Sequence, residues 1–332
     1  MANPFSVPHS KNFCGGNFQD WLEVNIIDKC NGRCTWCVEK YGIHPKHHAD
    51  WKTICNVAIA TEKRNVILLG GEPTLHPDFS RIANYLAKHK RNVWATTNGS
   101  LLTRRWVREN MGGVCGINIS IHNYDFAQNY VVTGIQLNEH NIIRAISELR
   151  AMKIKIRFNC NCIKGQIDSV EKIYKYIYMA IELGADSIRF SELKHDNKNF
   201  VDLAKLLEHK YGLNSDPYRF GCNQNVTIEG MPINFRQMCG MQTNLRPCPK
   251  NPKIIKKQVL YYDGKIYDGW QQKRGPRMTK EELIKLLFEV QDETKTIADA
   301  VEVILNSVPN PKSKESCKEC SRIHYYGSSC QY

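Results

Sequence analysis

The sequence lacks any run of apolar residues close to the roughly 18 that a membrane-spanning helix needs. Its first residues, MANPFSVPHSKNFCGG, also lack the apolar core of a secretory signal peptide. It contains no internal repeat and no low-complexity tract. These absences argue against membrane, secreted and repeat proteins, and they predict a cytoplasmic protein with no membrane partner.

A disulfide framework is also disfavoured, because a chain without a secretion signal is expected in a reducing compartment. The fourteen cysteines are then metal ligands, catalytic thiols or small buried side chains. Five are scattered and fit buried packing, namely Cys14, Cys55, Cys115, Cys160 and Cys162. Three more cluster within residues 30–37, and six are confined to the last third of the chain.

The composition fits a soluble globular protein, with 332 residues of which 42% are hydrophobic and 24% are charged. This length accommodates one large domain and a smaller one. A formal net charge of +13 favours a polyanionic partner or an anionic substrate. A lysine-rich solvated surface is the alternative explanation, since the lysines are spread along the chain.

Short β-rich segments alternate with amphipathic helical segments from residue 21 to about residue 195. The strand patterns cover 21–28, 65–71, 92–99, 116–123, 154–162 and 187–193. The helical patterns cover 49–63, 77–90, 102–110, 138–153 and 169–184, with caps at Asp78 and Ser169 and a terminal glycine at Gly184. Strict alternation predicts a parallel α/β sheet, and six units fit an open, partial (β/α)6 TIM-like barrel. Ligands bind such sheets at the carboxyl ends of the strands.

The pattern changes after residue 196. A helical segment at 199–212 precedes two hairpin signals, at 225–236 around Gly230 and at 259–270 around the Asp263-Gly264 turn. Helical patterns follow at 280–291 and 295–307. We therefore expect an N-terminal extension over 1–20, the barrel over 21–195, and a small α+β cysteine-rich domain over 196–332.

The segment DKCNGRCTWCVEK places Cys30, Cys34 and Cys37 in a C-x3-C-x2-C triplet directly after the first strand. Three thiols are one too few for a closed tetrahedral zinc site, and disulfides need pairs. A four-iron cluster held by three thiolates, by contrast, leaves one iron open to a small molecule. The triplet therefore indicates a cluster to which a cofactor binds.

This triplet, with an aromatic residue before its last cysteine, resembles the motif of the radical S-adenosylmethionine (SAM) superfamily. The segments LLGGEPTLHPDF (68–79), TTNG (96–99) and 119–165 strengthen the resemblance. It covers about residues 20–195. A zinc site or structural thiols remain the alternative for the triplet.

The resemblance implies a role for each matching residue. Cys30, Cys34 and Cys37 would ligate three irons of a [4Fe–4S] cluster, and the methionine part of SAM would bind the fourth. Trp36 would lie beside the SAM adenine, whose edge would meet the backbone of residues 190–193. The methionine amino group would be lined by Gly70, Gly71, Glu72 and Pro73, and the ribose and carboxylate by Asn98, Ser120 and Asn159. His122 stands where the family often has an acid, and no role follows for it.

The chemistry that the resemblance implies is reductive cleavage of SAM. One electron from the cluster would break a carbon–sulfur bond, giving methionine and a 5′-deoxyadenosyl radical that abstracts hydrogen from an unactivated C–H bond. The electron would come from an external one-electron reductant of the flavodoxin or ferredoxin kind.

The six late cysteines resemble the twitch or SPASM extension, which binds auxiliary [4Fe–4S] clusters in many members of the superfamily. The order of hairpins and cysteines matches a shortened version, although YDGW (267–270) stands where a ligand cysteine is frequent. We expect one auxiliary cluster bound by Cys239, Cys248, Cys317 and Cys320, with Cys222 and Cys330 as substitutes. Structural zinc and the absence of metal are the alternatives.

The favoured function is a radical SAM enzyme that modifies a peptide or protein, because the extension is most familiar from peptide-maturing enzymes. Against it, no separate leader-binding domain is expected before residue 20. Radical modification of a nucleotide or nucleic acid is the alternative, supported by the basic charge and by Arg104, Arg105 and Trp106 in one segment. A more distant alternative is a non-catalytic, zinc-stabilised module that binds nucleic acid. The substrate and the bond attacked stay open.

Overall fold

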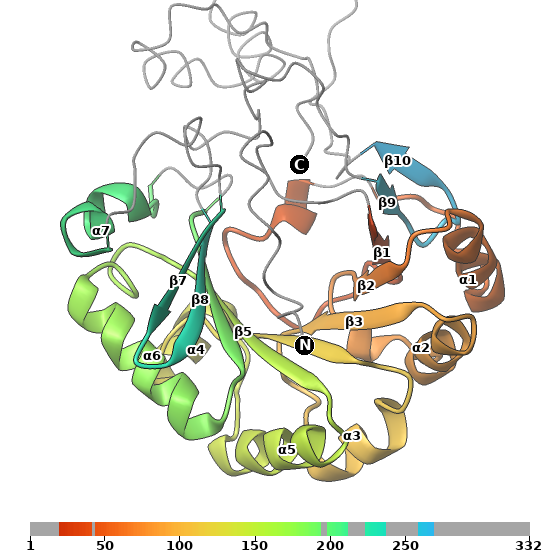
Figure 1. Ribbon diagram of the computed structural model, residues 1–332. Helices are drawn as coiled ribbons and strands as arrows, with labels where there is room; N and C mark the ends of the chain where they lie inside the picture. Colours follow the sequence, from red (N-terminus) through yellow and green to blue (C-terminus); the bar gives the residue numbers. More distant parts are fainter. Residues whose placement is uncertain (1–19, 42–43, 194–197, 212–222, 237–257, 269–332) are drawn as a thin grey trace, which may run out of the picture.

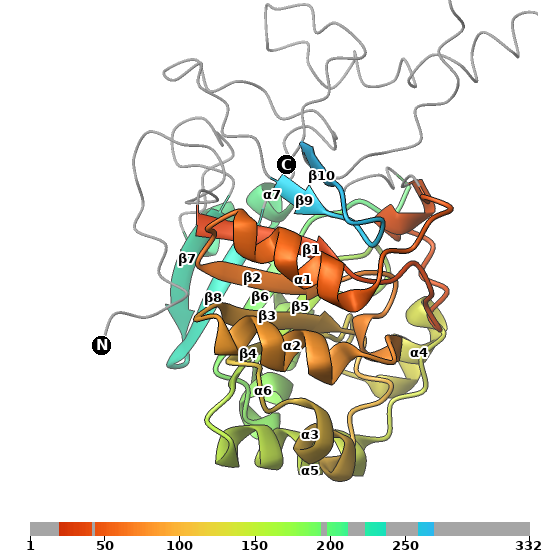
Figure 2. The same ribbon diagram turned by 90° about the vertical axis from the view of Figure 1, so that its right-hand side faces the viewer.

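One curved sheet organises the structure. The computed structural model describes residues 20–41, 44–193, 198–211, 223–236 and 258–268. Helices cover the convex face of the sheet, and its concave face surrounds a central space, so the strands form an open, partial barrel (Figures 1 and 2). The predicted (β/α)6 barrel is confirmed.

The first six strands are parallel and follow chain order around the barrel. They are β1 (Trp21–Asn25), β2 (Asn65–Leu69), β3 (Asn92–Thr97), β4 (Gly116–Ser120), β5 (Lys155–Asn161) and β6 (Ser187–Ser191). Each lies inside a segment predicted to be a strand. Because the six run in one direction, their carboxyl ends meet at one end of the barrel, and the loops that follow them gather there.

Helices connect these strands. The predicted segments contain α1 (Trp51–Ala60), α2 (Phe79–Lys88), α3 (Arg104–Asn110), α5 (Glu139–Ala151), α6 (Val170–Leu183) and α7 (Leu203–Tyr211). The sequence pattern does not predict α4 (Phe126–Thr133), which Asp125 caps and Gly134 ends in a left-handed conformation. No helix among the described residues is long and apolar enough to cross a bilayer.

The predicted helix caps are confirmed at α6 and not at α2. The Ser169 hydroxyl accepts from the Lys172 backbone N–H at 3.2 Å, and Gly184 ends the helix with φ of 83°. Asp78 precedes α2 but makes no capping hydrogen bond. Its carboxylate accepts from the Arg81 side chain at 2.8 Å instead.

Two hairpins lengthen the sheet at its two edges. The first consists of β7 (Asn223–Ile228) and β8 (Met231–Arg236), and the second of β9 (Gln258–Leu260) and β10 (Ile266–Asp268). Strand β8 pairs in parallel with β6, and β9 pairs in parallel with β1. Both predicted hairpins are confirmed, yet they continue the barrel sheet, so no gap in the sheet marks the predicted boundary at 195/196. The helices predicted at 280–291 and 295–307 lie outside the described residues.

Each strand buries one set of alternate residues and turns the other set toward the central space. Leu22 and Phe158 are fully buried in the core between the sheet and the helices. On the concave side, the rings of Trp21 and Trp94 lie 6.2 Å apart, and the Arg157 guanidinium lies 6.0 Å from the Trp94 ring. Strands β1, β3 and β5 therefore place these side chains in one shared space.

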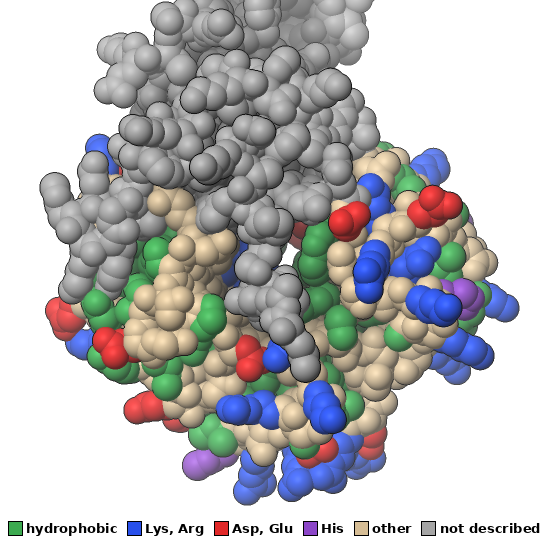
Figure 3. Space-filling model, viewed as in Figure 1, with side chains coloured by type: hydrophobic (Ala, Val, Ile, Leu, Met, Phe, Trp, Pro, Cys, Tyr) green, Lys and Arg blue, Asp and Glu red, His purple; other side chains and the backbone are tan. Residues whose placement is uncertain are grey.

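Basic side chains are distributed over the face shown in Figure 3, with acidic ones among them. In the segment predicted to contact nucleic acid, Arg104 donates to Glu148 at 2.8 Å. Arg105 donates to Glu109 at the same distance. Trp106 is partly buried and packs against the core. These contacts give the segment a structural role, so the argument for an anionic substrate has to rest on other residues.

Candidate functional site

The three cysteines of the triplet lie between β1 and the short helix η2 (Val38–Tyr41), at the carboxyl end of the barrel. Cys30 is exposed, and Cys34 and Cys37 are partly buried. Partial burial of its sulfur, together with the nearby charges of Glu72 and Cys37, raises the pKa of Cys30. Among the described residues, no three Cys, His, Asp or Glu side chains converge as a metal site. The loop thus gathers the cysteines without directing their sulfur atoms to one point.

The GGEP turn after β2 packs directly against this cysteine loop. The Gly71 N–H donates to the Ile27 carbonyl at 2.7 Å, and the Glu72 N–H donates to the Lys29 carbonyl at 2.8 Å. A Cβ atom on Gly71 would lie 2.3 Å from the Lys29 carbonyl oxygen, which only glycine avoids. The two loops are therefore held together through their backbones.

Glu72 joins the same turn to the loop after β3. Its buried carboxylate accepts from the Thr97 hydroxyl at 2.7 Å and from the Asn98 N–H at 2.6 Å. It also accepts from the N–H and hydroxyl of Thr74. Burial raises the pKa of Glu72, and these donors oppose that shift. Because the Asn98 side chain donates to Asn31 at 2.8 Å, Glu72 and Asn98 brace three strand-end loops.

Polar side chains on β4 and β5 face the central space beside these loops. Ser120 and Asn159 lie opposite each other in the register of the two strands. Neither the Asn159 Oδ1 nor the Asn118 Oδ1 has a hydrogen-bond partner among the described residues, although both are buried. A buried acceptor without a donor costs about 1–3 kcal/mol. A ligand or a water molecule that donates to these two oxygens would remove that cost.

A sequence model described as the radical SAM superfamily matches residues 24–190, half of the chain. That range holds the cysteine loop, the GGEP turn and the strand ends just described. The chain belongs to the radical SAM superfamily. It is therefore an enzyme of a family that uses a [4Fe–4S] cluster and SAM.

The radical SAM chain is also similar to individual proteins. It is 29% identical over 159 residues to the GTP 3′,8-cyclase of Photorhabdus laumondii, covering 45% of this chain and 47% of that protein. It is 28% identical over 179 residues to a probable GTP 3′,8-cyclase of Pyrobaculum aerophilum, covering 52% and 57%. The chain thus spans about half the length of these relatives. Streptococcus suis SuiB bound to its precursor peptide SuiA shares the fold, with a TM-score of 0.56 at 16% identity, covering 75% of this chain and 59% of that one.

The described residues fit both cofactors of the family. Three thiols on one loop are the donor set that a [4Fe–4S] cluster with an open iron requires. The Asn159 oxygen offers an acceptor to a polar ligand at the same end of the barrel. Trp36 supplies an apolar surface between two of the cysteines.

Trp36 packs against His122, a residue for which no role was predicted. Trp36 also packs with Ile163 and Leu193, and its ring meets His122 edge-on, with 5.5 Å between the ring centroids. Burial lowers the pKa of His122 to about 4. Its Nδ1 accepts from the Asn161 N–H at 3.0 Å, so the ring is neutral at pH 7 and carries its proton on Nε2. His122 therefore supports the Trp36 ring as a neutral side chain.

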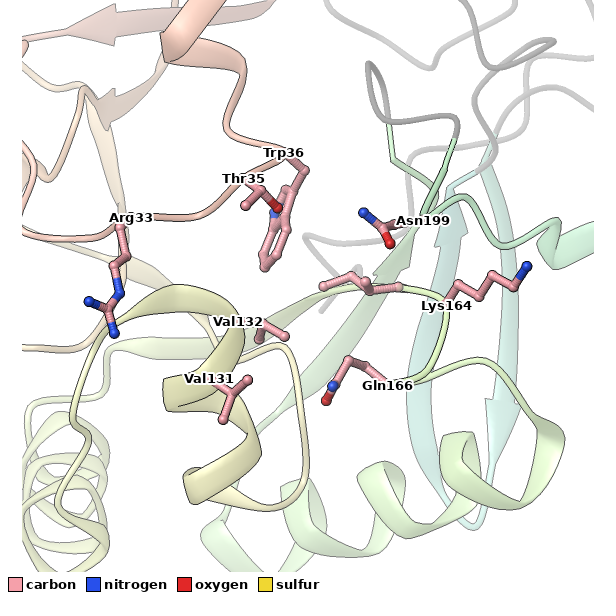
Figure 4. A pocket seen from close by; sticks show the side chains of 9 residues that line it. Arg33, Thr35, Trp36, Val131, Val132, Lys164, Gln166 and Asn199 are labelled. Atoms are coloured by element: carbon pink, nitrogen blue, oxygen red, sulfur yellow. The ribbon is translucent and has the colours of Figure 1, made fainter.

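A pocket of about 390 Å³ opens beside Trp36 (Figure 4). Its walls come from the cysteine loop, the end of α4, the loop after β5, and a residue that follows β6. The lining residues are Arg33, Thr35, Trp36, Val131, Val132, Ile163, Lys164, Gln166 and Asn199. None of the nine is acidic, so the pocket combines apolar walls with two positive charges at its sides.

Three arginines face the central space from neighbouring strands, and the sequence analysis did not single them out. Arg157, Arg189 and Arg236 come from β5, β6 and β8. Burial lowers the pKa of Arg157 to about 10, with a further contribution from Arg236. Burial and the charges of the other two arginines lower the pKa of Arg189 well below its usual range, and Glu23 opposes that shift. The concave side thus carries a concentrated positive charge.

The remaining cysteines divide into three groups. Cys55, Cys160 and Cys162 are buried as predicted, whereas Cys115 is exposed. Cys14 lies outside the described residues, and so do the six late cysteines Cys222, Cys239, Cys248, Cys317, Cys320 and Cys330. The auxiliary cluster and its ligands therefore stay predictions.

Proposed function

We propose that this radical SAM enzyme acts on a phosphate-bearing nucleotide. The observation that carries the proposal is the cluster of Arg157, Arg189 and Arg236 in the central space. Burial and neighbouring arginine charge lower the pKa of Arg157 and of Arg189, and a polyanionic ligand would relieve the repulsion among the three guanidinium groups. Guanidinium groups also match phosphate oxygens in two-point hydrogen bonds, which makes arginine suited to phosphate recognition.

The names of the relatives support the same substrate class. Both cyclases are named for GTP, and the similarity to them extends over 159 and 179 residues. The likeness to SuiB concerns the fold alone, at 16% identity. The peptide substrate favoured by the sequence analysis is therefore the weaker hypothesis, and the nucleotide alternative takes its place.

The cofactor roles follow the geometry of the strand-end loops. In this proposal Cys30, Cys34 and Cys37 ligate the [4Fe–4S] cluster, and Trp36, Gly70, Gly71, Glu72, Pro73, Asn98, Ser120 and Asn159 surround SAM. When bound, the cluster and SAM supply a 5′-deoxyadenosyl radical that removes hydrogen from the substrate. Glu72 keeps the loops in register, and the buried group of Trp36, Ile163 and Leu193 excludes water beside them.

The proposal retains one auxiliary [4Fe–4S] cluster bound by the late cysteines. Its support is the order of hairpins and cysteines in the sequence. A reconstituted protein should then contain about eight irons, two clusters of four. Replacement of Cys317 and Cys320 should remove four of them, whereas a zinc site would leave the iron content at about four before and after the change.

The substrate class can be tested directly. The enzyme, reconstituted without oxygen, is incubated with SAM and dithionite, and 5′-deoxyadenosine is measured with and without added nucleoside triphosphates. We expect at least one triphosphate to raise the rate severalfold above the background. If short peptides stimulate the reaction and no nucleotide does, the proposal is wrong.

A further inference from the structure

The last turn of α4 lies between the cysteine loop and solvent. The Thr133 carbonyl accepts from the Arg33 N–H at 2.7 Å, and the Cys34 thiol donates to the same carbonyl at 4.0 Å. Val132 packs on the apolar group that contains Trp36. One helical turn therefore covers a proposed cluster ligand on this side of the barrel.

Two apolar side chains near the end of α4 are exposed. Val131 is 65% exposed and Tyr130 is 39% exposed. They are neighbours in the chain, and the apolar wall of the pocket continues from Val131 through Val132. Exposed apolar side chains beside an apolar pocket wall are more typical of an interaction site than single exposed residues are.

Basic side chains flank the same surface on both sides. The Arg33 guanidinium lies 5.5 Å from the centre of the Tyr130 ring. Gly134 makes room for it, because a Cβ atom there would lie 2.4 Å from the Arg33 Cγ. Lys164 lies across the pocket and extends away from it (Figure 4). The surface formed by Arg33, Tyr130, Val131 and Lys164 is called the docking rim below.

We propose that the docking rim binds the electron donor, a small acidic one-electron carrier protein with an exposed flavin. Each SAM molecule cleaved consumes one electron, so the carrier is oxidised by one electron for every cluster that it reduces. Electron transfer weakens steeply with distance, which favours docking on a segment that contacts the cysteine loop, as the last turn of α4 does through Thr133. Carboxylates around the flavin would meet Arg33 and Lys164, while the flavin edge would meet Tyr130 and Val131. The inference rests on the cluster at the triplet and not on the nucleotide substrate.

Two substitutions test the docking rim. Val131→Glu replaces an exposed apolar side chain with a negative charge, and Lys164→Glu reverses a charge. The matched controls are Ile143→Glu, which changes a 44%-exposed residue on α5, and Lys155→Glu, which changes an exposed residue at the opposite end of β5. All four variants should bind the same amount of iron as the wild type.

Two measurements separate docking from catalysis. The first is the affinity of the reconstituted protein for a purified acidic flavodoxin, by isothermal titration at low salt. We expect each rim variant to bind about tenfold more weakly, with the difference shrinking as salt is added. The second is 5′-deoxyadenosine formation driven by flavodoxin and its reductase or by dithionite. Only the flavodoxin-driven rate of the rim variants should fall, and the controls should match the wild type in both measurements.

Two results would overturn the inference. If the rim variants bind flavodoxin as tightly as the controls do, the donor docks elsewhere. If the dithionite-driven rate falls as far as the flavodoxin-driven rate, the docking rim belongs to the cofactor or substrate site. Neither result would bear on the nucleotide proposal, which depends on the arginines of the central space.

Discussion

The two halves of the barrel build their strand ends in different ways. The loops after β1, β2 and β3 are joined by backbone hydrogen bonds, such as the one from Gly71 to Ile27, and by the buried carboxylate of Glu72. The strands β4, β5, β6 and β8 instead turn polar and charged side chains to the central space, including Asn159 and Arg189. The first half is suited to holding a cofactor in a fixed position. The second half offers side chains that can select a substrate.

The largest expected effect comes from the first half. Replacing Cys30, Cys34 and Cys37 together by alanine should remove one [4Fe–4S] cluster, because the proposal gives that cluster no other protein ligand. Iron content should fall by about four and 5′-deoxyadenosine formation should cease. Cys115→Ala, which removes an exposed cysteine elsewhere, should change neither. Undiminished SAM cleavage in the triple variant would contradict the assignment.

A smaller but selective effect is expected in the second half. Arg189→Gln removes one positive charge from the central space, and a hydrogen bond to a charged group contributes about 1.5–3 kcal/mol. The affinity for a nucleoside triphosphate should therefore fall roughly 10- to 100-fold, measured by isothermal titration, while SAM affinity stays within about twofold. Arg105→Gln, on the exposed face of α3, is the control. Equal losses of affinity for SAM and for the triphosphate would show that the two halves of the barrel do not bind these two ligands independently.

Because backbone contacts join the loops of the first half of the barrel, we predict that one substitution there lowers SAM affinity and iron content together. A Cβ atom in Gly71→Ala would lie within 2.6 Å of the carbonyl oxygens of both Asp28 and Lys29, so the cysteine loop has to move. Overpacking of this kind costs about 1–3 kcal/mol. SAM affinity and iron content should fall together. Gly112→Ala should preserve both, because its Cβ atom would make only an ordinary contact with the Asn84 side-chain oxygen, at 3.5 Å. A loss of SAM affinity with full iron content would mean that Gly71 contacts SAM alone.

The same contrast explains what the sequence could predict. A backbone-built site needs particular residue types at fixed spacing, so Cys30, Cys34, Cys37 and the GGEP turn formed a motif that indicated the family. The strict alternation of strand and helix patterns was enough to predict the barrel. Short local signals, such as the Asp263-Gly264 turn, were enough for both hairpins.

The features of the fold and of the site that were not predicted depend on contacts between segments far apart in the sequence. Arg157, Arg189 and Arg236 are ordinary residues within three separate strands, and only the register and curvature of the sheet bring them together. The joining of the hairpins to opposite edges of one sheet likewise depends on tertiary pairing. Helix α4 was missed because Asn129 and Thr133 are buried on a short helix with little apolar periodicity.

The central claim is that the substrate is a nucleotide whose own C–H bond supplies the hydrogen. The most direct test is to incubate the reconstituted enzyme with SAM, reductant and GTP deuterated at its ribose carbons, and to measure the mass of the 5′-deoxyadenosine formed. We predict that deuterium appears in 5′-deoxyadenosine from the wild type and that, at a GTP concentration near the wild-type dissociation constant, much less deuterium is transferred in Arg189→Gln. Unlabelled 5′-deoxyadenosine, formed at a rate that no nucleoside triphosphate changes, would contradict the account.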